Sequence, residues 1–286
     1  MTASIAGLSE IAERYDVLLC DVWGVIHDGV EAFAEPCAAL ARWRRDRGPV
    51  VLISNSPRPS GAVADQMDAV GVPREAWSAL VTSGDVTRDL LAARAPGPAW
   101  RIGPERDDPL FEGLGLAFAG PGEAAFIACS GPNDDEVETP EDYRRPLTLA
   151  AARGIDMICA NPDLVVQRGA KLIYCGGALA RLYVDLGGVA VMAGKPHAPI
   201  YDLCLAKATD LLGGGLARER VLAIGDAVAT DVLGARGRGL DVLFIAAGIH
   251  GEAVVKPDGG LDGQAVERLL ARDGMAVDYI MTGLAW

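Results

Sequence analysis

The sequence has few cysteines, and their spacing fits neither a metal site nor a disulfide framework. Six cysteines are scattered over 286 residues, without a C-x-x-C pair and without a Cys/His spacing suited to zinc. Such a distribution excludes the common structural zinc sites and favours buried thiols in a reducing compartment. We therefore expect neither zinc nor disulfide bonds.

Positive charge is also scarce. The chain has 26 Lys and Arg against 39 Asp and Glu, a formal net charge of −13, and its longest arginine cluster, RWRRDR at 42–47, is typical of the solvated end of a helix. A chain of this charge repels nucleic acid and anionic membrane surfaces. We therefore expect no nucleic acid and no membrane as partners.

Long hydrophobic runs are missing, although 50% of the residues are hydrophobic. Arg181 and Asp185 interrupt one of the most apolar stretches, YCGGALARLYVDLGGVAVMAG, and no segment offers the roughly 20 apolar residues that span a bilayer. The first residues, MTASIAGLSEIAERY, acquire acidic side chains early, which predicts an amphipathic helix and no signal peptide. These features together predict a cytoplasmic protein.

Apolar strand patterns alternate with helical patterns in the two outer parts of the chain. Continuous apolar strands separated by helices indicate a parallel sheet covered on both faces. Ligands bind beyond the carboxyl ends of such strands, and Asp21, Ser54 and Asp226 stand at predicted ends. The predicted strands are 16–21, 49–55, 78–83, 220–226 and 240–246, and the predicted helices are 36–47, 60–70, 84–94 and 228–239.

The middle of the chain has a different composition. Residues 84–189 are rich in Gly and Pro, but they include the strand patterns AFIACS and DMICA and a helical pattern at 140–153. We predict a second α/β unit at 84–189, inserted between the two parts of the main domain, 1–83 and 190–286. A single continuous sheet is the alternative, and it is disfavoured because polar residues at strand ends cluster only in the outer segments.

Two motifs follow the first two strands. In LLCDVWGVIHDG, Asp21 ends a strand and Gly24 permits a tight turn that brings backbone groups close to a ligand. A carboxylate there is suited to act as a nucleophile or metal ligand, or to cap the next helix. Ser54 and Asn55 follow the second strand, where they are suited to bind phosphate oxygens or to form a turn.

Two further motifs follow the inserted segment. Lys195 in AGKPHAPIYD stands just before a helix predicted from about residue 199, where it supplies a localised positive charge. Asp226 ends a strand in LAIGDAVATDVLGA, and Asp231 follows at the start of the next helix. Together with Asp21 these carboxylates would form an oxygen-rich pocket. Like charges this close are unfavourable unless a hard cation such as Mg²⁺ neutralises them.

The order of these motifs, D-x-x-G, S-N, G-K-P and G-D-x-x-x-T-D, resembles that of the haloacid dehalogenase (HAD) superfamily across the whole chain. The segments NPDLVV at 161–166 and CGGALA at 175–180 are similar to those of the class IIA, NagD-like members, which carry an inserted α/β cap of the C2 type. The resemblance implies an α/β fold with a Rossmann-like parallel-sheet core. It also implies Mg²⁺-dependent hydrolysis of a phosphate ester through an aspartyl-phosphate.

The resemblance implies a role for each residue that matches a family motif. Asp21 would be the nucleophile and a Mg²⁺ ligand, and Asp226 and the backbone carbonyl of Trp23 would be further metal ligands. Ser54 and Asn55 would bind phosphate, and Lys195 would bind phosphate and stabilise the nucleophile. Asp231 would support the metal site.

One position departs from the phosphatase pattern D-x-D-G, in which the second Asp protonates the leaving alkoxide and then activates water. Here that position is Trp23, and Asp28 is either a replacement acid or part of the HDG turn. Three functions follow: a hydrolase of small phosphate esters with weakened acid-base catalysis, a phosphate-binding regulator with a degenerate site, or a dehalogenase-like hydrolase. We favour the first, because the metal and phosphate motifs are intact. The pair of Asp226 and Asp231 argues against the third, since a metal-free site has no reason to gather that charge.

Substrate selectivity in C2-capped relatives comes from the cap. The resemblance therefore points to Asn161, Asp163 and the 175–178 loop, although turn formation and packing explain these residues equally well. Arg58, four residues after Ser54, either reaches a substrate anion or is solvated. We expect a small phosphorylated metabolite as the substrate. The oligomeric state stays open, and a homo-oligomer is one alternative.

Overall fold

The computed structural model describes residues 2–168 and 171–286 of the chain. The chain divides into two compact units, each built from more than one segment. The first comprises Met1–Ser54, Ala64–Val81 and Tyr201–Trp286, and the second comprises Asn55–Val63 and Thr82–Ile200.

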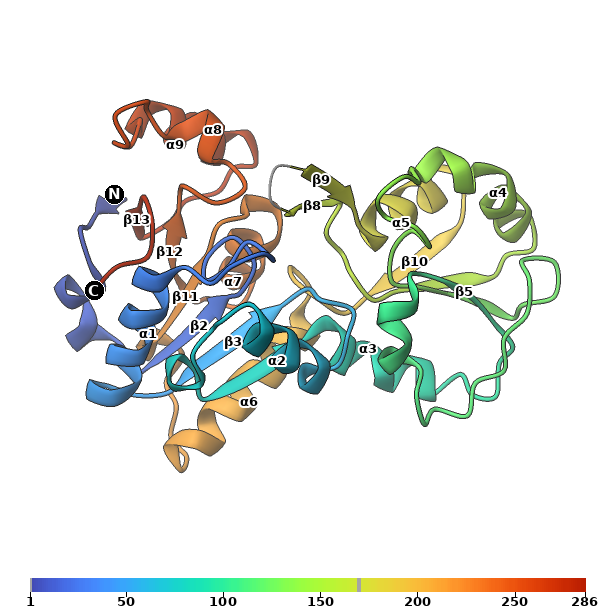
Figure 1. The fold of residues 1–286 in the computed structure, drawn as a ribbon, viewed down its shortest axis with the longest axis horizontal. Helices are drawn as coiled ribbons and strands as arrows, with labels where there is room; N and C mark the ends of the chain where they lie inside the picture. The colour runs from blue at the N-terminus through green and yellow to red at the C-terminus, as the bar shows by residue number, and fades with distance from the viewer. Residues whose placement is uncertain (1, 169–170) are drawn as a thin grey trace. The chain divides into compact units, whose positions relative to one another are not determined.

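A seven-stranded sheet in the order β1-β13-β12-β11-β2-β3-β4 forms the first unit (Figure 1). Every pair from β1 to β3 is parallel. Strands β2, β3 and β11 are buried at every residue, because both faces of a parallel sheet are covered. The strands are β1 (Ala3–Ser4), β2 (Val17–Asp21), β3 (Val50–Ser54), β4 (Ala79–Thr82), β11 (Val221–Gly225), β12 (Asp241–Ile245) and β13 (Tyr279–Met281).

Helices connect these strands, and those predicted at 36–47 and 60–70 are α1 and α2. The helix predicted at 228–239 is divided, since a π-helical turn over Val228–Val232 precedes α7. Such turns occur frequently at functional sites. The helices are α1 (Ala34–Asp46), α2 (Ser60–Ala69), α6 (Ala198–Leu212), α7 (Leu233–Gly237), α8 (Gly251–Val254) and α9 (Gly263–Arg272).

The amphipathic helix predicted at the N-terminus is wrong. Residues 2–15 instead form the short strand β1 and two 3₁₀ turns, Leu8–Glu10 and Ala12–Arg14. Pairing of β1 with β13 requires extended backbone, and Gly7 stays extended with φ −163°. The backbone carbonyl of Trp286 occupies the place where a Cβ at Gly7 would lie, so tertiary contact overrides the helical pattern.

The second unit contains a separate four-stranded parallel sheet in the order β10-β7-β6-β5 and an antiparallel hairpin, β8-β9 (Figure 1). The predicted strands AFIACS and DMICA are β6 and β7, whereas α5 and β10 were not predicted. The elements are β5 (Ala99–Ile102), β6 (Phe126–Cys129), β7 (Asp156–Cys159), β8 (Val165–Arg168), β9 (Lys171–Tyr174), β10 (Val189–Met192), α3 (Ser83–Ala92), α4 (Arg144–Ala152) and α5 (Gly176–Asp185).

These two sheets confirm the predicted fold class, an α/β protein with a parallel-sheet core and an inserted α/β unit. The alternative of one continuous sheet is wrong. The limits predicted for the insert, 84 and 189, remain a prediction, because compactness alone does not define a domain that folds independently.

All six cysteines lie in the described part of the chain, where they are buried and form no disulfide. Among residues 2–168 and 171–286, no helix has both the length and the apolar character needed to cross a membrane.

The second unit has its own hydrophobic core, and α4 tests its contribution to stability. Leu147 on α4 is fully buried against residues of β6, β7 and α5, while Leu149 on the same helix is 48% exposed. We expect Leu147→Ala to lower the free energy of unfolding by about 2–5 kcal/mol, because it leaves a cavity. Urea denaturation measures this, with Leu149→Ala as the control, expected to change it by less than about 0.5 kcal/mol. Equal effects would contradict the assigned core.

Candidate functional site

Three buried carboxylates gather at one edge of the first unit's sheet. Strands β2 and β11 are parallel neighbours with Cys20 beside Ile224, so their carboxyl ends deliver Asp21 and Asp226 to the same place. Asp231 joins them from the π-helical turn. One carboxylate oxygen from each residue lies within 4.8 Å of the others, and the residues are only 7%, 4% and 5% exposed, respectively.

Glycines allow the backbone to approach Asp226 closely. Gly24 has φ +82°, and a Cβ there would overlap Asp226 Oδ2. Gly248, in the loop after β12, would produce the same overlap. The backbone next to Trp23 therefore lies against this carboxylate, as a carbonyl ligand at that residue requires.

Backbone amides orient two of the carboxylates. The Ile249 N–H donates to Asp226 Oδ2 at 2.7 Å, and the Ala227 N–H donates to Asp231 Oδ2 at 3.1 Å. Neither Gly248 nor Ile249 was predicted to belong to the site, although a glycine two residues after the predicted strand 240–246 was an available signal.

The donor set fits a hard divalent cation. Three negative charges buried together repel one another strongly in a medium of low dielectric constant unless a cation offsets them. All the side-chain donors are carboxylate oxygens, which Mg²⁺ and Ca²⁺ prefer. Asp21, Asp226 and Asp231 are thus the residues suited to hold such an ion.

Ser54 lies at the same edge of this sheet. It ends β3, whose Ile53 is the register partner of Asp21, and it is 7% exposed. The first unit therefore brings a hydroxyl beside the carboxylate cluster, as the strand pattern predicted.

Asn55 and Lys195 come together in the second unit. The Lys195 N–H donates to Asn55 Oδ1 at 2.7 Å, and Asn55 Nδ2 donates to the Lys195 carbonyl at 3.1 Å and to Asp163 Oδ1 at 2.8 Å. The Asn55 side chain thus hydrogen-bonds both the Lys195 backbone and the Asp163 carboxylate. Two residues predicted to bind phosphate and one predicted to bind substrate form one hydrogen-bonded group.

The turn at 161–163 is held internally. Asn161 Oδ1 accepts a hydrogen bond from the Asp163 N–H at 3.1 Å, and the Asp163 carbonyl accepts one from the Gly177 N–H at 3.1 Å. A Cβ at Gly177 would overlap the Pro162 carbonyl. These contacts give the NPD and CGG segments a packing role, in addition to any role toward a substrate.

Arg58 lies in a mixed-charge cluster of the second unit. Its guanidinium Nε is 3.8 Å from Asp107 Oδ1, and its side chain is 18% exposed. Burial lowers the pKa of Arg58, and the nearby positive charges of Arg106 and Arg168 lower it further, while Asp107 acts in the opposite direction. Arg58 is therefore paired within the unit rather than simply solvated.

The two titratable side chains of the turn after Asp21, His27 and Asp28, both accept hydrogen bonds from backbone N–H groups of that turn. Asp28 Oδ1 accepts hydrogen bonds from the Val30 and Glu31 N–H groups at 2.8 and 3.0 Å, and these bonds lower the pKa of Asp28. His27 is 1% exposed, and burial lowers its pKa to about 4. At neutral pH Asp28 is ionised and His27 is neutral, which supports the assignment of Asp28 to a turn.

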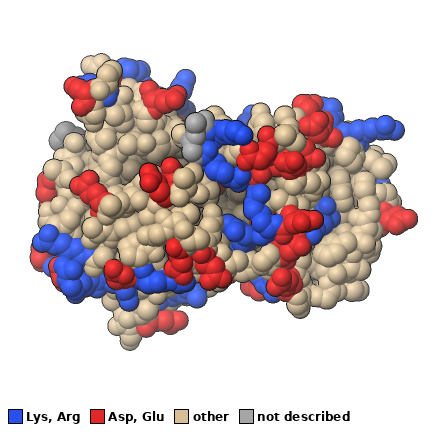
Figure 2. Space-filling view, in the orientation of Figure 1, with Lys and Arg blue, Asp and Glu red and all other residues tan. Residues whose placement is uncertain are grey.

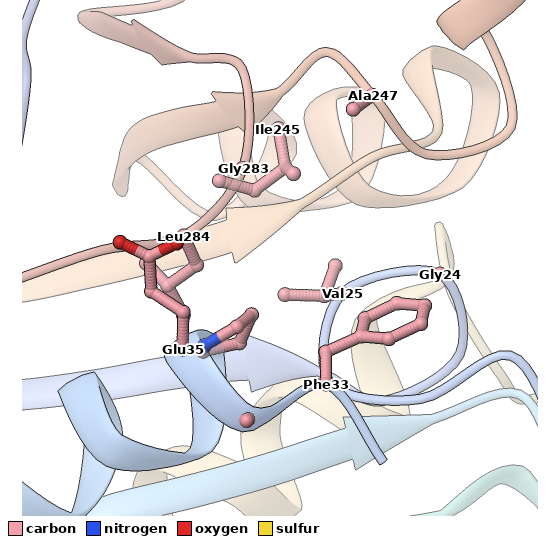
Figure 3. A pocket seen from close by; sticks show the side chains of 10 residues that line it. Gly24, Val25, Phe33, Glu35, Ile245, Ala247, Gly283 and Leu284 are labelled. Atoms are coloured by element: carbon pink, nitrogen blue, oxygen red, sulfur yellow. The ribbon is translucent and has the colours of Figure 1, made fainter. Parts of the chain in front are cut away.

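A cleft of about 400 Å³ also lies in the first unit, and its lining is mainly apolar. Figure 3 shows the side chains of Val25, Phe33 and Leu284 around it, with Gly24 and Ala247 at its rim. Glu35 is the charged residue among those that line this cleft. An apolar lining with a carboxylate is unsuited to a phosphate group, so the carboxylate cluster is the better candidate site.

Acidic and basic side chains alternate on the face drawn in Figure 2, without a broad basic surface. This distribution agrees with the net charge of −13.

The structure combines a parallel α/β sheet, three buried carboxylates at one edge of that sheet and a separate α/β unit. Residues 18–117 match the family model of haloacid dehalogenase-like hydrolases, and residues 192–265 match a model of HAD-hydrolase-like proteins. A hydrolase of the haloacid dehalogenase-like family from Brucella suis 1330 is 44% identical, covers 98% of this chain and 99% of its own, and has a TM-score of 0.87. The chain belongs to the haloacid dehalogenase-like family, as its motifs predicted.

The chain is also similar to two more distant proteins. The 5'-nucleotidase YutF of Bacillus subtilis (strain 168) is 27% identical over 240 residues, which are 83% of this chain and 89% of that protein. A p-nitrophenyl phosphatase from Archaeoglobus fulgidus shares the fold with a TM-score of 0.69 at 19% identity, over 94% of this chain and 97% of its own.

The carboxylate cluster predicts cation binding that calorimetry measures directly. We expect Mg²⁺ to bind one site, and Asp226→Asn to weaken binding roughly tenfold or more, because a charged ligand at the centre of the cluster becomes neutral. Asp210→Asn, an exposed position on α6, is the matched control for loss of one negative charge. Equal Mg²⁺ affinity in the wild type and in Asp226→Asn would contradict the hypothesis that these carboxylates bind a cation.

Proposed function

We propose that the protein is a Mg²⁺-dependent phosphatase of the class IIA, C2-capped type that hydrolyses a small phosphate ester through an aspartyl-phosphate. The observation that carries the proposal is the buried cluster of Asp21, Asp226 and Asp231, whose oxygens lie within 4.8 Å of one another. The similarity to a 5'-nucleotidase and to a p-nitrophenyl phosphatase supports the same reaction class. We further propose a cytoplasmic protein with a cap at 84–189 between core segments 1–83 and 190–286, and leave a homo-oligomer as an alternative.

In this proposal Asp21 is the nucleophile. Its carboxylate oxygen forms a bond to phosphorus while the bond from phosphorus to the ester oxygen breaks, and the leaving oxygen departs with the electron pair. The bound Mg²⁺ would offset the negative charge that gathers around Asp21 and the phosphoryl group. Asp226 and the Trp23 carbonyl would be further ligands of that ion, and Asp231 would support Asp226.

Ser54, Asn55 and Lys195 bind the phosphoryl group in this proposal. Asn55 already uses its side-chain amide on Lys195 and Asp163, so it acts on phosphate through its backbone and chiefly as a positioning residue for Lys195. The Lys195 ammonium contributes a positive charge that becomes more favourable as charge develops on the phosphoryl oxygens. Arg58, Asn161 and Asp163 remain candidates for contact with the rest of the substrate.

Weakened acid-base catalysis follows from Trp23. An indole neither donates a catalytic proton nor activates water, and such groups are typically worth about 10²–10⁴-fold in rate. A phosphate-binding protein with a degenerate site is the second candidate function, and Trp23 is the observation that favours it. The buried carboxylates argue against a metal-free dehalogenase-like reaction.

Pre-steady-state kinetics with 4-nitrophenyl phosphate test the proposed function. Aspartyl-phosphate formation needs no proton donor for this leaving group, whereas its hydrolysis lacks the usual base. We therefore expect a rapid release of about one nitrophenolate per protein molecule, followed by slow turnover. Removal of Mg²⁺ by a chelator and Asp21→Asn should each abolish both phases. Phosphate binding without any release would instead favour the degenerate site.

Trp23→Asp tests the assignment of the missing acid. We expect the wild type to hydrolyse simple alkyl phosphates roughly 10²–10⁴-fold more slowly than activated aryl esters, and Trp23→Asp to raise alkyl turnover by restoring a carboxyl group. Released phosphate measures both rates, and a thermal melt checks that the variant folds. Fast alkyl turnover in the wild type without a gain in Trp23→Asp would mean that another group supplies the proton.

Asp163 tests the positioning of Lys195. Asp163→Ala removes the acceptor that holds Asn55, so kcat should fall about tenfold to a hundredfold while KM changes less, because misplacement chiefly affects the transition state. Asp163→Asn keeps an acceptor oxygen and should recover most of kcat. Asp185→Ala, an exposed carboxylate of the same unit, is the control. A rise in KM alone, unrelieved by Asp163→Asn, would assign Asp163 to substrate binding instead.

A further inference from the structure

Trp23 lies beside the reacting groups of the proposed site. It is two residues from Asp21, so the two Cα atoms are separated by at most about 7 Å. It directly precedes Gly24, whose backbone lies against the Asp226 carboxylate. The side chain therefore starts from the edge of the carboxylate cluster, in the position where the family pattern has the acid that contacts the leaving group.

The Trp23 indole packs against two residues of the following turn, Gly29 and His27. The six-membered part of its ring lies against Gly29, where a Cβ would overlap the Cη2 and Cζ2 atoms and the Cζ3 atom would be 3.4 Å away. Gly29 has φ +85°, which independently favours glycine. The turn from Gly24 to Gly29 is thus shaped around a large flat side chain.

His27 supports the ring from a second direction. The two ring centroids are 5.1 Å apart at an interplanar angle of 69°, an edge-on pair of the kind that aromatic side chains prefer. His27 itself is buried, and its Nδ1 accepts a hydrogen bond from the Gly29 N–H at 2.9 Å. These contacts restrict the orientation of the indole, so a ligand meets it at a small conformational cost.

Trp23 is half-buried, while His27, which packs against it, is fully buried. An indole held in this way, two residues from Asp21, is suited to present an aromatic surface to a ligand. Aromatic surfaces of this kind bind planar rings with little dependence on their substituents.

We propose that Trp23 is a specificity-determining residue that stacks on a planar aromatic leaving group of the phosphate ester. The proposal rests on the proposed function and names its substrate class as esters of phenols or hydroxylated heteroaromatic rings. When Asp21 attacks phosphorus, the bond from phosphorus to the ring oxygen breaks and the aryloxide keeps the electron pair. Solvent then protonates it. Aryloxides are weaker bases than alkoxides, so the same substitution that removes the acid selects substrates that need none.

A pair of phosphate esters separates stacking from leaving-group acidity. We compare 4-chlorophenyl phosphate with hexafluoroisopropyl phosphate, because their alcohols have closely similar acidity but only one is flat and aromatic. The wild type should favour the aryl ester in kcat/KM roughly fivefold or more. Trp23→Phe should keep most of this preference. Trp77→Leu, another half-buried indole of the same unit, should keep it.

A binding measurement makes the test independent of turnover. With Mg²⁺ present, phenylphosphonate should bind roughly fivefold or more tightly than cyclohexylphosphonate by calorimetry, and Trp23→Leu should remove the difference. Equal affinities in the wild type, or a difference that survives in Trp23→Leu, would overturn the stacking role. A difference that Trp23→Leu removes, in a protein without turnover, would support the stacking role while the proposed phosphatase function fails.

Discussion

Mutual repulsion among three buried carboxylates is the constraint on which the rest of the first unit depends. Asp21, Asp226 and Asp231 gain nothing in stability from their proximity, because like charges at low dielectric constant oppose folding. The parallel strands β2 and β11 nevertheless deliver two of them to one edge, and a π-helical turn adds the third. Glycines and backbone N–H groups then complete the surroundings. A cluster of this kind is suited to hold a cation that offsets its negative charge.

Strand ends were the part of this arrangement that the sequence could predict. An uninterrupted apolar run reports a buried strand wherever it occurs, so the positions of Asp21, Ser54 and Asp226 followed without tertiary information. The first 15 residues behaved differently, because pairing with β13 and contact with the Trp286 backbone override their helical pattern. Elements such as β10 were missed for the same reason, since a four-residue strand depends on its neighbour β7 more than on its own residues.

Contacts between distant residues explain what the sequence left open at the site. Asn55 is 108 residues from Asp163 and 140 from Lys195, and no local pattern predicts that a single amide joins them. The NPD and CGG segments were recognisable as motifs, but their packing against each other through Gly177 follows only from the structure. Sequence reasoning thus named candidate residues at the strand ends, whereas the contacts that position Asn55, Asp163 and Lys195 follow only from the structure.

The turn after Asp21 contains three side chains that bear on the proposed reaction: Trp23, His27 and Asp28. Its two polar candidates are committed to structure, since Asp28 binds backbone amides and His27 is buried and neutral. The Trp23 indole packs in the same turn, against Gly29 and His27. Replacing the Trp with a carboxylate therefore costs packing as well as gaining a proton donor, whereas an ordinary degenerate position would tolerate many residues. The packing of Trp23 against Gly29 and His27, near three buried carboxylates, is therefore the observation that favours the proposed aryl ester substrate over a degenerate site.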